Sequence, residues 1–215
     1  MPKNKFHPVG EKAIRAMLAR YQCPVPYHQV RTRFLGSIAY PGEVKPLEVV
    51  KSLWGGTFPP VDSLDDLNEM LAVLVMGLWN ELTSHDDPRI RFRALQVPLE
   101  PTSANLGNFG TVRAQEVESF LEGLFNGEDE TDLPKRAHDA ATYLGEIRSM
   151  MLAVTDLIER TADQPEDRAA IKETIKHLGT MTEIMETEMQ AAVVSGARLR
   201  AAGPSPVMNP GETRH

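Results

Sequence analysis

Two long apolar stripes at helical spacing occupy the last third of the chain and constrain its fold more than any other feature. The first follows Pro134 in alternating steps of three and four residues as far as Ile158, and the second spans residues 171–193. Asp163-Gln164-Pro165 lies between them, and this composition is typical of a turn followed by a helix start. Two amphipathic helices joined by a short turn form an antiparallel hairpin, which we expect at residues 132–201.

Helical spacing also dominates the first half of the chain. Apolar residues recur at this spacing over residues 11–21, over 28–39 and after Pro46. Ser63 is placed to accept a hydrogen bond from the Asp66 backbone N–H and so to begin a further helix. That helix is nearly apolar all round from residue 67 to 82, which predicts a central position. Its expected core residues are Leu71, Leu74, Leu78 and Trp79.

The stretch 83–110 has little periodicity and contains Pro, Asn and Gly, so we interpret it as a long connection with a short extended piece near 92–97. Thr111 is then expected to cap a helix that ends near residue 125. The sequence therefore predicts an all-α protein with a compact multi-helix domain (9–127), the hairpin (132–201) and a disordered tail (203–215). The pattern leaves open whether the hairpin packs on the first domain or on another chain.

Composition and charge exclude several functional classes. The formal net charge of −7 disfavours a general nucleic-acid binder, which must neutralise phosphates. A single cysteine rules out an intrachain disulfide framework and a Cys-rich zinc module. No apolar run of signal-peptide length follows the first lysines, and the strongly apolar stretch 71–79 is too short to span a bilayer. We therefore expect a cytoplasmic protein without membrane contacts.

No catalytic motif is recognisable. The chain has no Gly-x-Ser-x-Gly nucleophile elbow, and Gly107-Asn108-Phe109-Gly110 lacks the Lys-Ser/Thr pair that completes a phosphate-binding loop. We accordingly predict no catalytic residue and no cofactor.

One local cluster suggests an alternative function. His85, Asp86 and Asp87 together carry ligand types that divalent metals accept, and Glu81 lies one helical turn before them. They would support a metal-dependent hydrolase-like enzyme. The same residues also suit a helix end and a turn before Pro88, and we favour that interpretation, so no metal ligand is assigned.

A second alternative is a nucleic-acid-associated regulator. Arg89, Arg91 and Arg93 alternate with apolar residues, which in an extended segment places three guanidinium groups on one face. Charge on an exposed edge, or pairing with the acidic middle of the chain, accounts for the same pattern, and nucleic acid is the less favoured partner.

The leading functional hypothesis rests on the methionines of the hairpin. Flexible thioether side chains adapt to varied partners, although they also fill helical cores. Because two helices alone rarely cover both stripes, we predict that the hairpin binds a protein partner or a second copy of itself. The expected partner-binding residues are Met150, Met151, Val154, Met181, Met185 and Met189.

Four segments within about residues 34–125 are similar to the YecA/YgfB-like family of small helical bacterial proteins. They are Phe34–Ala39, Pro46–Gly55, Trp79-Asn80-Glu81 and Glu118–Leu124. Val117 and Ser119 stand where the family has Trp and Gly, and the chain lacks the Cys-rich zinc tail of some relatives, so no zinc role is implied. The resemblance implies a helical fold, a bacterial cytoplasmic setting and an adaptor or regulatory role without catalytic residues.

Overall fold

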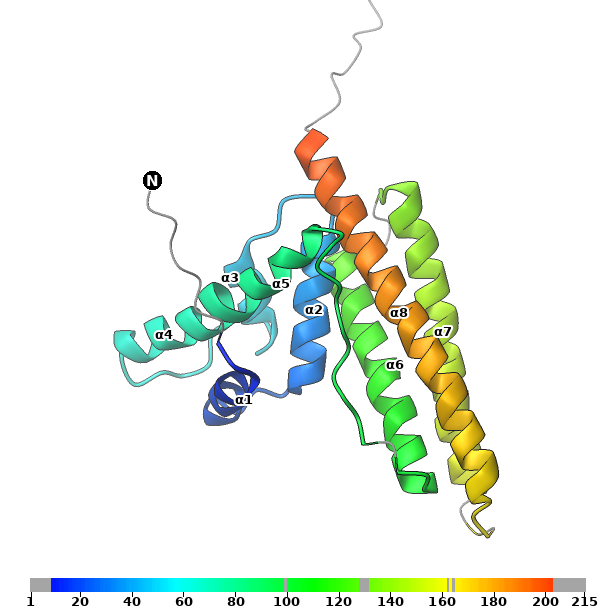
Figure 1. Ribbon diagram of the computed structural model, residues 1–215. Helices are drawn as coiled ribbons and strands as arrows, with labels where there is room; N and C mark the ends of the chain where they lie inside the picture. Colours follow the sequence, from blue (N-terminus) through cyan, green and yellow to red (C-terminus); the bar gives the residue numbers. More distant parts are fainter. Residues whose placement is uncertain (1–8, 99, 128–131, 162, 164, 203–215) are drawn as a thin grey trace, which may run out of the picture.

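The computed structural model describes residues 9–98, 100–127, 132–161, 163 and 165–202, and every regular element among them is helical (Figure 1). The elements are α1 (Glu11–Arg20), α2 (Tyr27–Ala39), α3 (Pro46–Ser52), α4 (Leu64–Leu71), the π-helix η1 (Ala72–Trp79), α5 (Asn80–Thr83), the 3₁₀-helix η2 (Ser84–Asp86), α6 (Ser103–Phe125), α7 (Lys135–Arg160) and α8 (Arg168–Ala202). The all-α prediction is confirmed for these residues. The predicted tail at 203–215 lies outside them. No described helix combines the length and apolarity needed to cross a bilayer.

Three long helices, α6, α7 and α8, run antiparallel to their neighbours, and α2 crosses the face of α6 and α8 (Figure 1). The predicted hairpin is therefore present as α7 and α8. It packs on α6 and α2, and the buried residues form one continuous cluster that includes members from both predicted units. The packing question left open by the sequence is thus answered within this chain, because the hairpin packs one side of its apolar stripes against the helices that precede it.

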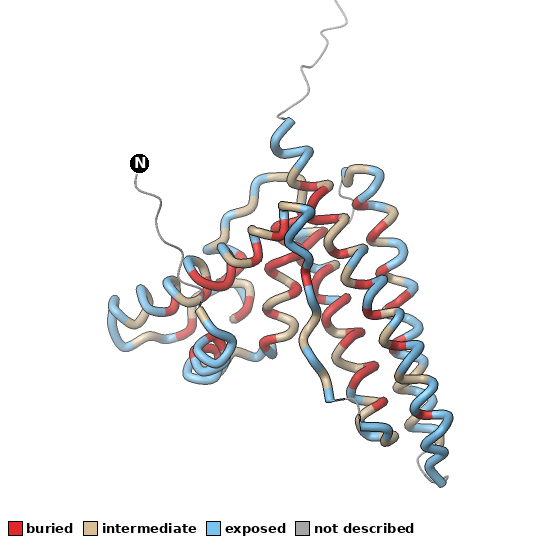
Figure 2. The backbone as a smooth tube through the Cα atoms, viewed as in Figure 1, coloured by how far each residue is buried: buried red, intermediate tan, exposed pale blue. Residues whose placement is uncertain are grey.

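The centre of the core lies at the crossing of α2 and α6 (Figure 2). Gly36 of α2 and Gly123 of α6 let the two backbones approach closely. A Cβ atom on Gly36 would lie 2.0 Å from the Phe120 carbonyl oxygen, and one on Gly123 would lie 2.2 Å from the Arg33 carbonyl oxygen. Phe34 and Phe120 are both fully buried, and the Phe34 ring packs edge-on against Trp79 with 5.5 Å between the ring centroids.

The helix expected at the centre lies at the side instead, which corrects the sequence-based prediction. α4, η1 and α5 form one continuous rod beside α2 (Figure 1). Its inner positions are buried as expected at Leu74, Leu78 and Trp79, but Leu71 is only half-buried and Met76 is 55% exposed. Other helices cover only part of the circumference of this rod. The prediction of a central position from its apolar composition was therefore wrong.

The helix that Thr111 is expected to cap has its N-cap nine residues earlier. Thr102 is the N-cap of α6, and its hydroxyl oxygen accepts a hydrogen bond from the Asn105 backbone N–H at 3.2 Å. Gly107 and Gly110 suggested a loop, yet both lie inside the helix. Gly110 is needed there because a Cβ atom would lie 2.8 Å from the Met151 carbonyl oxygen of α7.

Candidate functional site

The structure divides the six predicted partner-binding residues into a buried set and a surface set. The fully buried set is Met151, Met185 and Met189. The remaining three reach the surface to different degrees, with Met150 exposed and Val154 and Met181 half-buried. Of the six residues, Met150 is the most accessible to a partner, whereas the buried methionines belong to the core of this chain.

A stripe of large apolar side chains runs along the outside of α7. Tyr143, Met150 and Leu157 follow one another at seven-residue intervals and are 53%, 48% and 55% exposed. Seven residues make nearly two helical turns, so the three side chains share one face of α7. Leu144 and Met151 directly follow Tyr143 and Met150 in the sequence, so they lie about 100° further round the helix, and both are fully buried.

The register of the hairpin places α8 beside this stripe. Arg136 of α7 and Glu188 of α8 form an ion pair at 2.6 Å. The two helices are antiparallel, so positions advance along α7 as they go back along α8. Tyr143, seven residues after Arg136, therefore lies at the same level of the hairpin as Met181, seven residues before Glu188. We call the surface made by Tyr143, Met150 and Leu157, with half-buried Val154 and Met181 at its edge, the hairpin outer face.

A second distinctive feature is the extended segment 90–98, here called the strap, which crosses the molecule in front of α2 and α6 (Figure 1). It has no strand partner among the described residues. Its backbone is instead held by side chains of α6. The Leu95 carbonyl accepts a hydrogen bond from Arg113 Nη2 at 2.6 Å, and the Leu95 N–H donates to Glu116 Oε1 at 3.4 Å.

Arg113 and Glu116 are themselves a buried ion pair, one turn apart on α6. Burial raises the pKa of the Glu116 carboxyl, and the neighbouring Arg113 guanidinium opposes that rise. A buried charge is tolerated only when it is paired and hydrogen-bonded. The Leu95 backbone therefore stabilises the buried ion pair through its hydrogen bonds, and the ion pair in turn holds this part of the strap in place.

Side chains of α8 hold the other end of the strap. Gln190 Oε1 accepts a hydrogen bond from the Phe92 N–H at 2.8 Å, and Gln190 Nε2 donates to the His85 carbonyl oxygen. Glu186 accepts a hydrogen bond from the Ala94 N–H at 2.9 Å and pairs with Arg93 at 2.7 Å. The strap is thus attached to α6 at one end and to α8 at the other, by residues that are distant from it in sequence.

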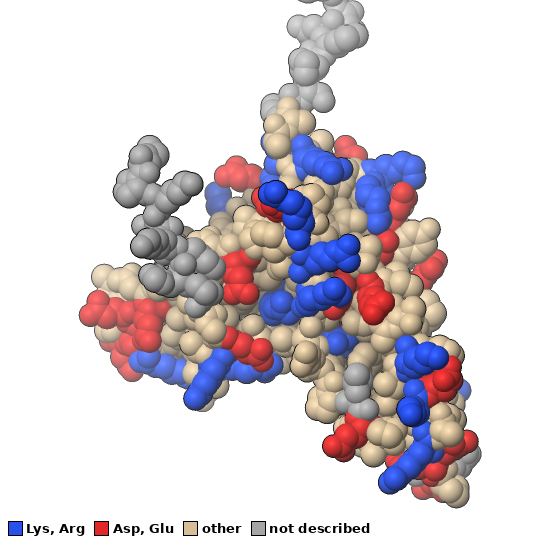
Figure 3. Space-filling view, viewed as in Figure 1, with Lys and Arg blue, Asp and Glu red and all other residues tan. Residues whose placement is uncertain are grey.

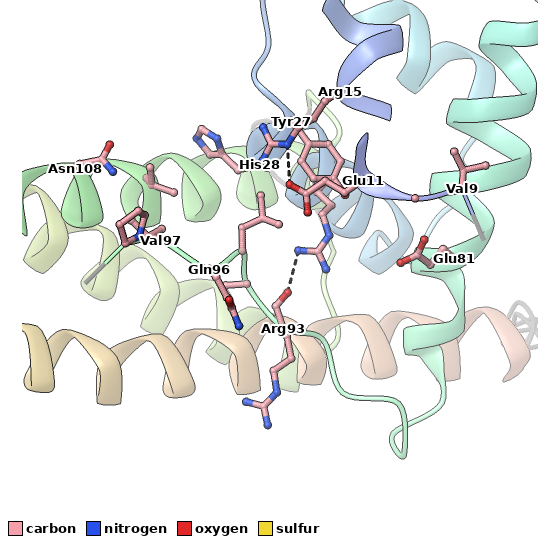
Figure 4. A pocket seen from close by; sticks show the side chains of 16 residues that line it. Val9, Glu11, Arg15, Tyr27, His28, Glu81, Arg93, Gln96, Val97 and Asn108 are labelled. Atoms are coloured by element: carbon pink, nitrogen blue, oxygen red, sulfur yellow. Dashed lines mark hydrogen bonds and ion pairs between the residues drawn. The ribbon is translucent and has the colours of Figure 1, made fainter. Parts of the chain in front are cut away.

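Between the strap and α1, α2, α5 and α6 lies a groove of about 740 Å³ (Figure 4). Its charged members are Glu11, Arg15, Arg31, Glu81 and Arg93, and His28 adds an imidazole. Figure 4 shows Glu81 and Val9 towards one end of the groove and Asn108 and Val97 towards the other. The volume falls within the range of about 300–1,000 Å³ that is typical of ligand sites.

Arg31 occupies a distinctive position in the groove. Its Nη1 donates to the Arg93 carbonyl oxygen at 2.9 Å, and its Cζ lies 4.8 Å from the centroid of the Phe92 ring. No carboxylate of the described residues is in ion-pair contact with Arg31. This half-buried cation is therefore held in place by a carbonyl and an aromatic face, with its charge unneutralised.

The residues of the alternative metal site at 85–87 are engaged in other contacts. His85 is buried, and its Nδ1 donates to the Ile90 carbonyl oxygen at 3.0 Å, while Asp87 pairs with Arg89 at 2.5 Å. Burial lowers the pKa of His85, and hydrogen bonds from Arg89 lower the pKa of Asp87 to about 2. Across the described ranges, no three His, Cys, Asp or Glu side chains gather as they would around a metal ion. These residues instead stabilise the turn that leads into the strap.

The three alternating arginines separate into different roles. Arg89 pairs with Asp87 and Arg93 with Glu186, whereas Arg91 is exposed with no ion pair to a described carboxylate. On the face shown in Figure 3, lysines and arginines gather over the strap and the adjoining part of α8, next to acidic side chains. Two of the three guanidinium groups that the nucleic-acid hypothesis requires are therefore already neutralised.

Sequence reasoning missed most of the residues that build the groove and the strap. Arg31 and Gln190 carry no local signal, since their partners lie 62 and 98 residues away. Arg113 and Glu116 also gave no signal of burial, because an Arg and a Glu three residues apart, next to Gln115 and Glu118, is typical of an exposed helix face. No family model, curated protein or solved structure matches this chain.

Proposed function

We propose that this protein is a non-enzymatic interaction module that assembles with a second copy of itself through the hairpin outer face. The observation that carries the proposal is the stripe formed by Tyr143, Met150 and Leu157. Three large apolar side chains stay about half exposed at heptad spacing on a helix whose adjoining face is already buried. Such a seam is typical of helices that pair with another helix.

The spacing of the stripe favours a second copy over an unrelated partner. Tyr143 and Leu157 lie at equal distances of seven residues on either side of Met150. In an antiparallel pair related by a two-fold axis, Met150 would meet its own counterpart, and Tyr143 would meet Leu157. The same pairing would bring Asp139, four residues before the stripe, close to Arg160, three residues after it. Within one copy Asp139 pairs with Lys135 and Arg160 with Asp156, so the contact between copies would join two existing ion pairs.

The resemblance to the YecA/YgfB-like family remains part of the proposal, together with the cytoplasmic adaptor or regulatory role that it implies. Two of the segments that carry it lie against each other, because Gly36 of the first and Gly123 of the second form the α2–α6 crossing. The non-enzymatic assignment draws support from the use of His85, Asp87, Arg113 and Glu116 in internal hydrogen bonds and ion pairs.

The first test is the oligomeric state of the purified chain by size-exclusion chromatography with light scattering over a range of concentrations. We expect a dimer that Met150→Glu converts to a monomer, because it places a carboxylate in the centre of the seam. Leu64→Glu, at an exposed leucine on α4, is the matched control and should leave the dimer intact. A wild-type chain that is monomeric at every concentration would refute the proposal.

Cysteine cross-linking tests the antiparallel geometry in a Cys23→Ser background. Met150→Cys should form a disulfide-linked dimer under mild oxidation, because the two copies of residue 150 meet on the axis. Tyr143→Cys should not cross-link to itself, but it should do so when mixed with Leu157→Cys. Equal self-cross-linking of Tyr143→Cys and Met150→Cys would indicate a parallel pair and contradict the model of assembly.

A further inference from the structure

We propose that the groove beside the strap binds an extended peptide segment through a carboxylate group, with Arg31 as its anchor. This site is separate from the hairpin outer face and does not depend on self-association.

Arg31 has donors to spare. A guanidinium carries five N–H donors, and the described residues provide one acceptor for Arg31, the Arg93 carbonyl oxygen. The Phe92 ring at 4.8 Å supports the guanidinium and limits its rotation. A planar guanidinium with free donors binds carboxylates through two parallel hydrogen bonds, and prior ordering lowers the entropy cost of doing so.

The other cationic or potentially cationic groups of the groove are already engaged. Arg15 pairs with Glu11 at 2.7 Å, and its guanidinium lies over the Tyr27 ring. Arg93 pairs with Glu186, and Figure 4 shows its side chain directed away from the groove. His28 Nε2 donates to Gln115 Oε1 at 2.8 Å. Arg31 is therefore the groove cation, within the described chain, that still lacks an anionic partner.

The walls select the kind of anion. Glu11 and Glu81 also line the groove and would repel a phosphate dianion or a nucleic-acid backbone, whereas a single carboxylate opposite Arg31 meets less repulsion. The rest of the lining is mixed: Gln96 and Asn108 contribute side-chain amides that can hydrogen-bond a peptide backbone, and the apolar side chains are Val9, Leu95, Val97, Pro98 and Val112. This combination fits a short apolar peptide that carries one acidic group. The carboxylate can come from an internal Asp or Glu or from a chain terminus.

The test is a titration of the full-length ¹⁵N-labelled protein, followed through the arginine Nε–Hε resonances. The first probe is acetyl-Ala-Val-Glu-Val-Ala-amide, which has an internal carboxylate only. The second is acetyl-Ala-Val-Gln-Val-Ala with a free terminal carboxylate, and the third is the same Gln peptide as an amide. We expect a saturable shift of the Arg31 resonance with the first or second probe and none with the third. Which of the two succeeds distinguishes the internal from the terminal source.

Variants define the anchor. Arg31→Gln should weaken binding about tenfold or more, since a hydrogen bond to a charged group is worth about 1.5–3 kcal/mol. Arg91→Ala is the matched control, because this arginine is on the strap but does not line the groove. Glu11→Gln releases Arg15 and should tighten binding several-fold. Met150→Glu should bind as the wild type does, which separates failure of this site from failure of self-association.

Three results would overturn the inference. One is the absence of any saturable shift with both carboxylate peptides at millimolar concentration. Another is equal affinity of the wild-type and Arg31→Gln proteins, measured on samples with unchanged circular dichroism. The last is a single-stranded oligonucleotide that displaces the bound labelled peptide as effectively as unlabelled peptide does, which would assign the groove to nucleic acid.

Discussion

The backbone of α2 approaches α6 so closely that a Cβ atom on Gly36 would lie 2.0 Å from the carbonyl oxygen of Phe120. Real side chains do not tolerate such a contact, so the two helices would have to separate. Because this crossing lies at the centre of the core, and α8 packs on the same helix α2, the separation would disturb three helices at once. The glycine is thus a packing requirement in the middle of a helix where it otherwise costs stability.

Gly36→Ala should therefore destabilise the protein by about 2–3 kcal/mol, the usual cost of overpacking a core. Gly145→Ala on α7 is the control, because a Cβ atom there meets nothing within 4 Å. The control should gain about 0.5–1 kcal/mol from its better helix propensity. Urea denaturation followed by circular dichroism measures both, and equal effects of the same sign would contradict the proposed close contact.

The two sets of hairpin methionines should respond differently to truncation. Met185→Ala removes a fully buried side chain and should cost about 2–5 kcal/mol in unfolding free energy. Met150→Ala at the exposed position should change stability by less than about 0.5 kcal/mol, measured at a concentration where the chain is monomeric. Comparable losses at both positions would show that Met150 belongs to the core.

Gln190 should control the order of the strap. Gln190→Leu leaves the Phe92 N–H and the His85 carbonyl without their partner, which should cost about 1–3 kcal/mol. Amide hydrogen exchange at Phe92 and Ala94 should accelerate in this variant. Gln96→Leu is the matched control, since its exposed side chain makes no hydrogen bond within the described chain. Unchanged exchange in Gln190→Leu would show that the strap is held by other contacts.

His85 should make the fold sensitive to mild acid. Burial lowers its pKa in the folded state below the ordinary value of 6.5, so the unfolded chain takes up a proton that the folded protein does not. The contribution of His85 to stability is therefore complete above pH 6.5 and declines as the pH falls through the depressed pKa. His85→Asn should reduce the loss of unfolding free energy between pH 7.5 and pH 5.5. Identical pH dependence in both proteins would refute this assignment.

Local sequence signals predicted most of the helices because these signals act within a few residues. Ser63 accepts the Asp66 N–H as expected, and Pro46 and Pro134 stand at helix starts. The start of α6 was misplaced because Gly107 and Gly110 weaken helix propensity locally. Their compensation is close packing against α7, which lies far along the chain and leaves no local trace.

The amphipathic pattern by itself determined that the chain is helical and that its last third forms a hairpin, since periodicity reports which residues can share a face. Only the tertiary structure decided which faces are covered. Met151 and Met185 are buried while Met150 is not, although all three belong to the same kind of stripe. The strap and Arg31 depend on hydrogen bonds between residues up to 105 positions apart, and contacts of that range arise only when the helices pack.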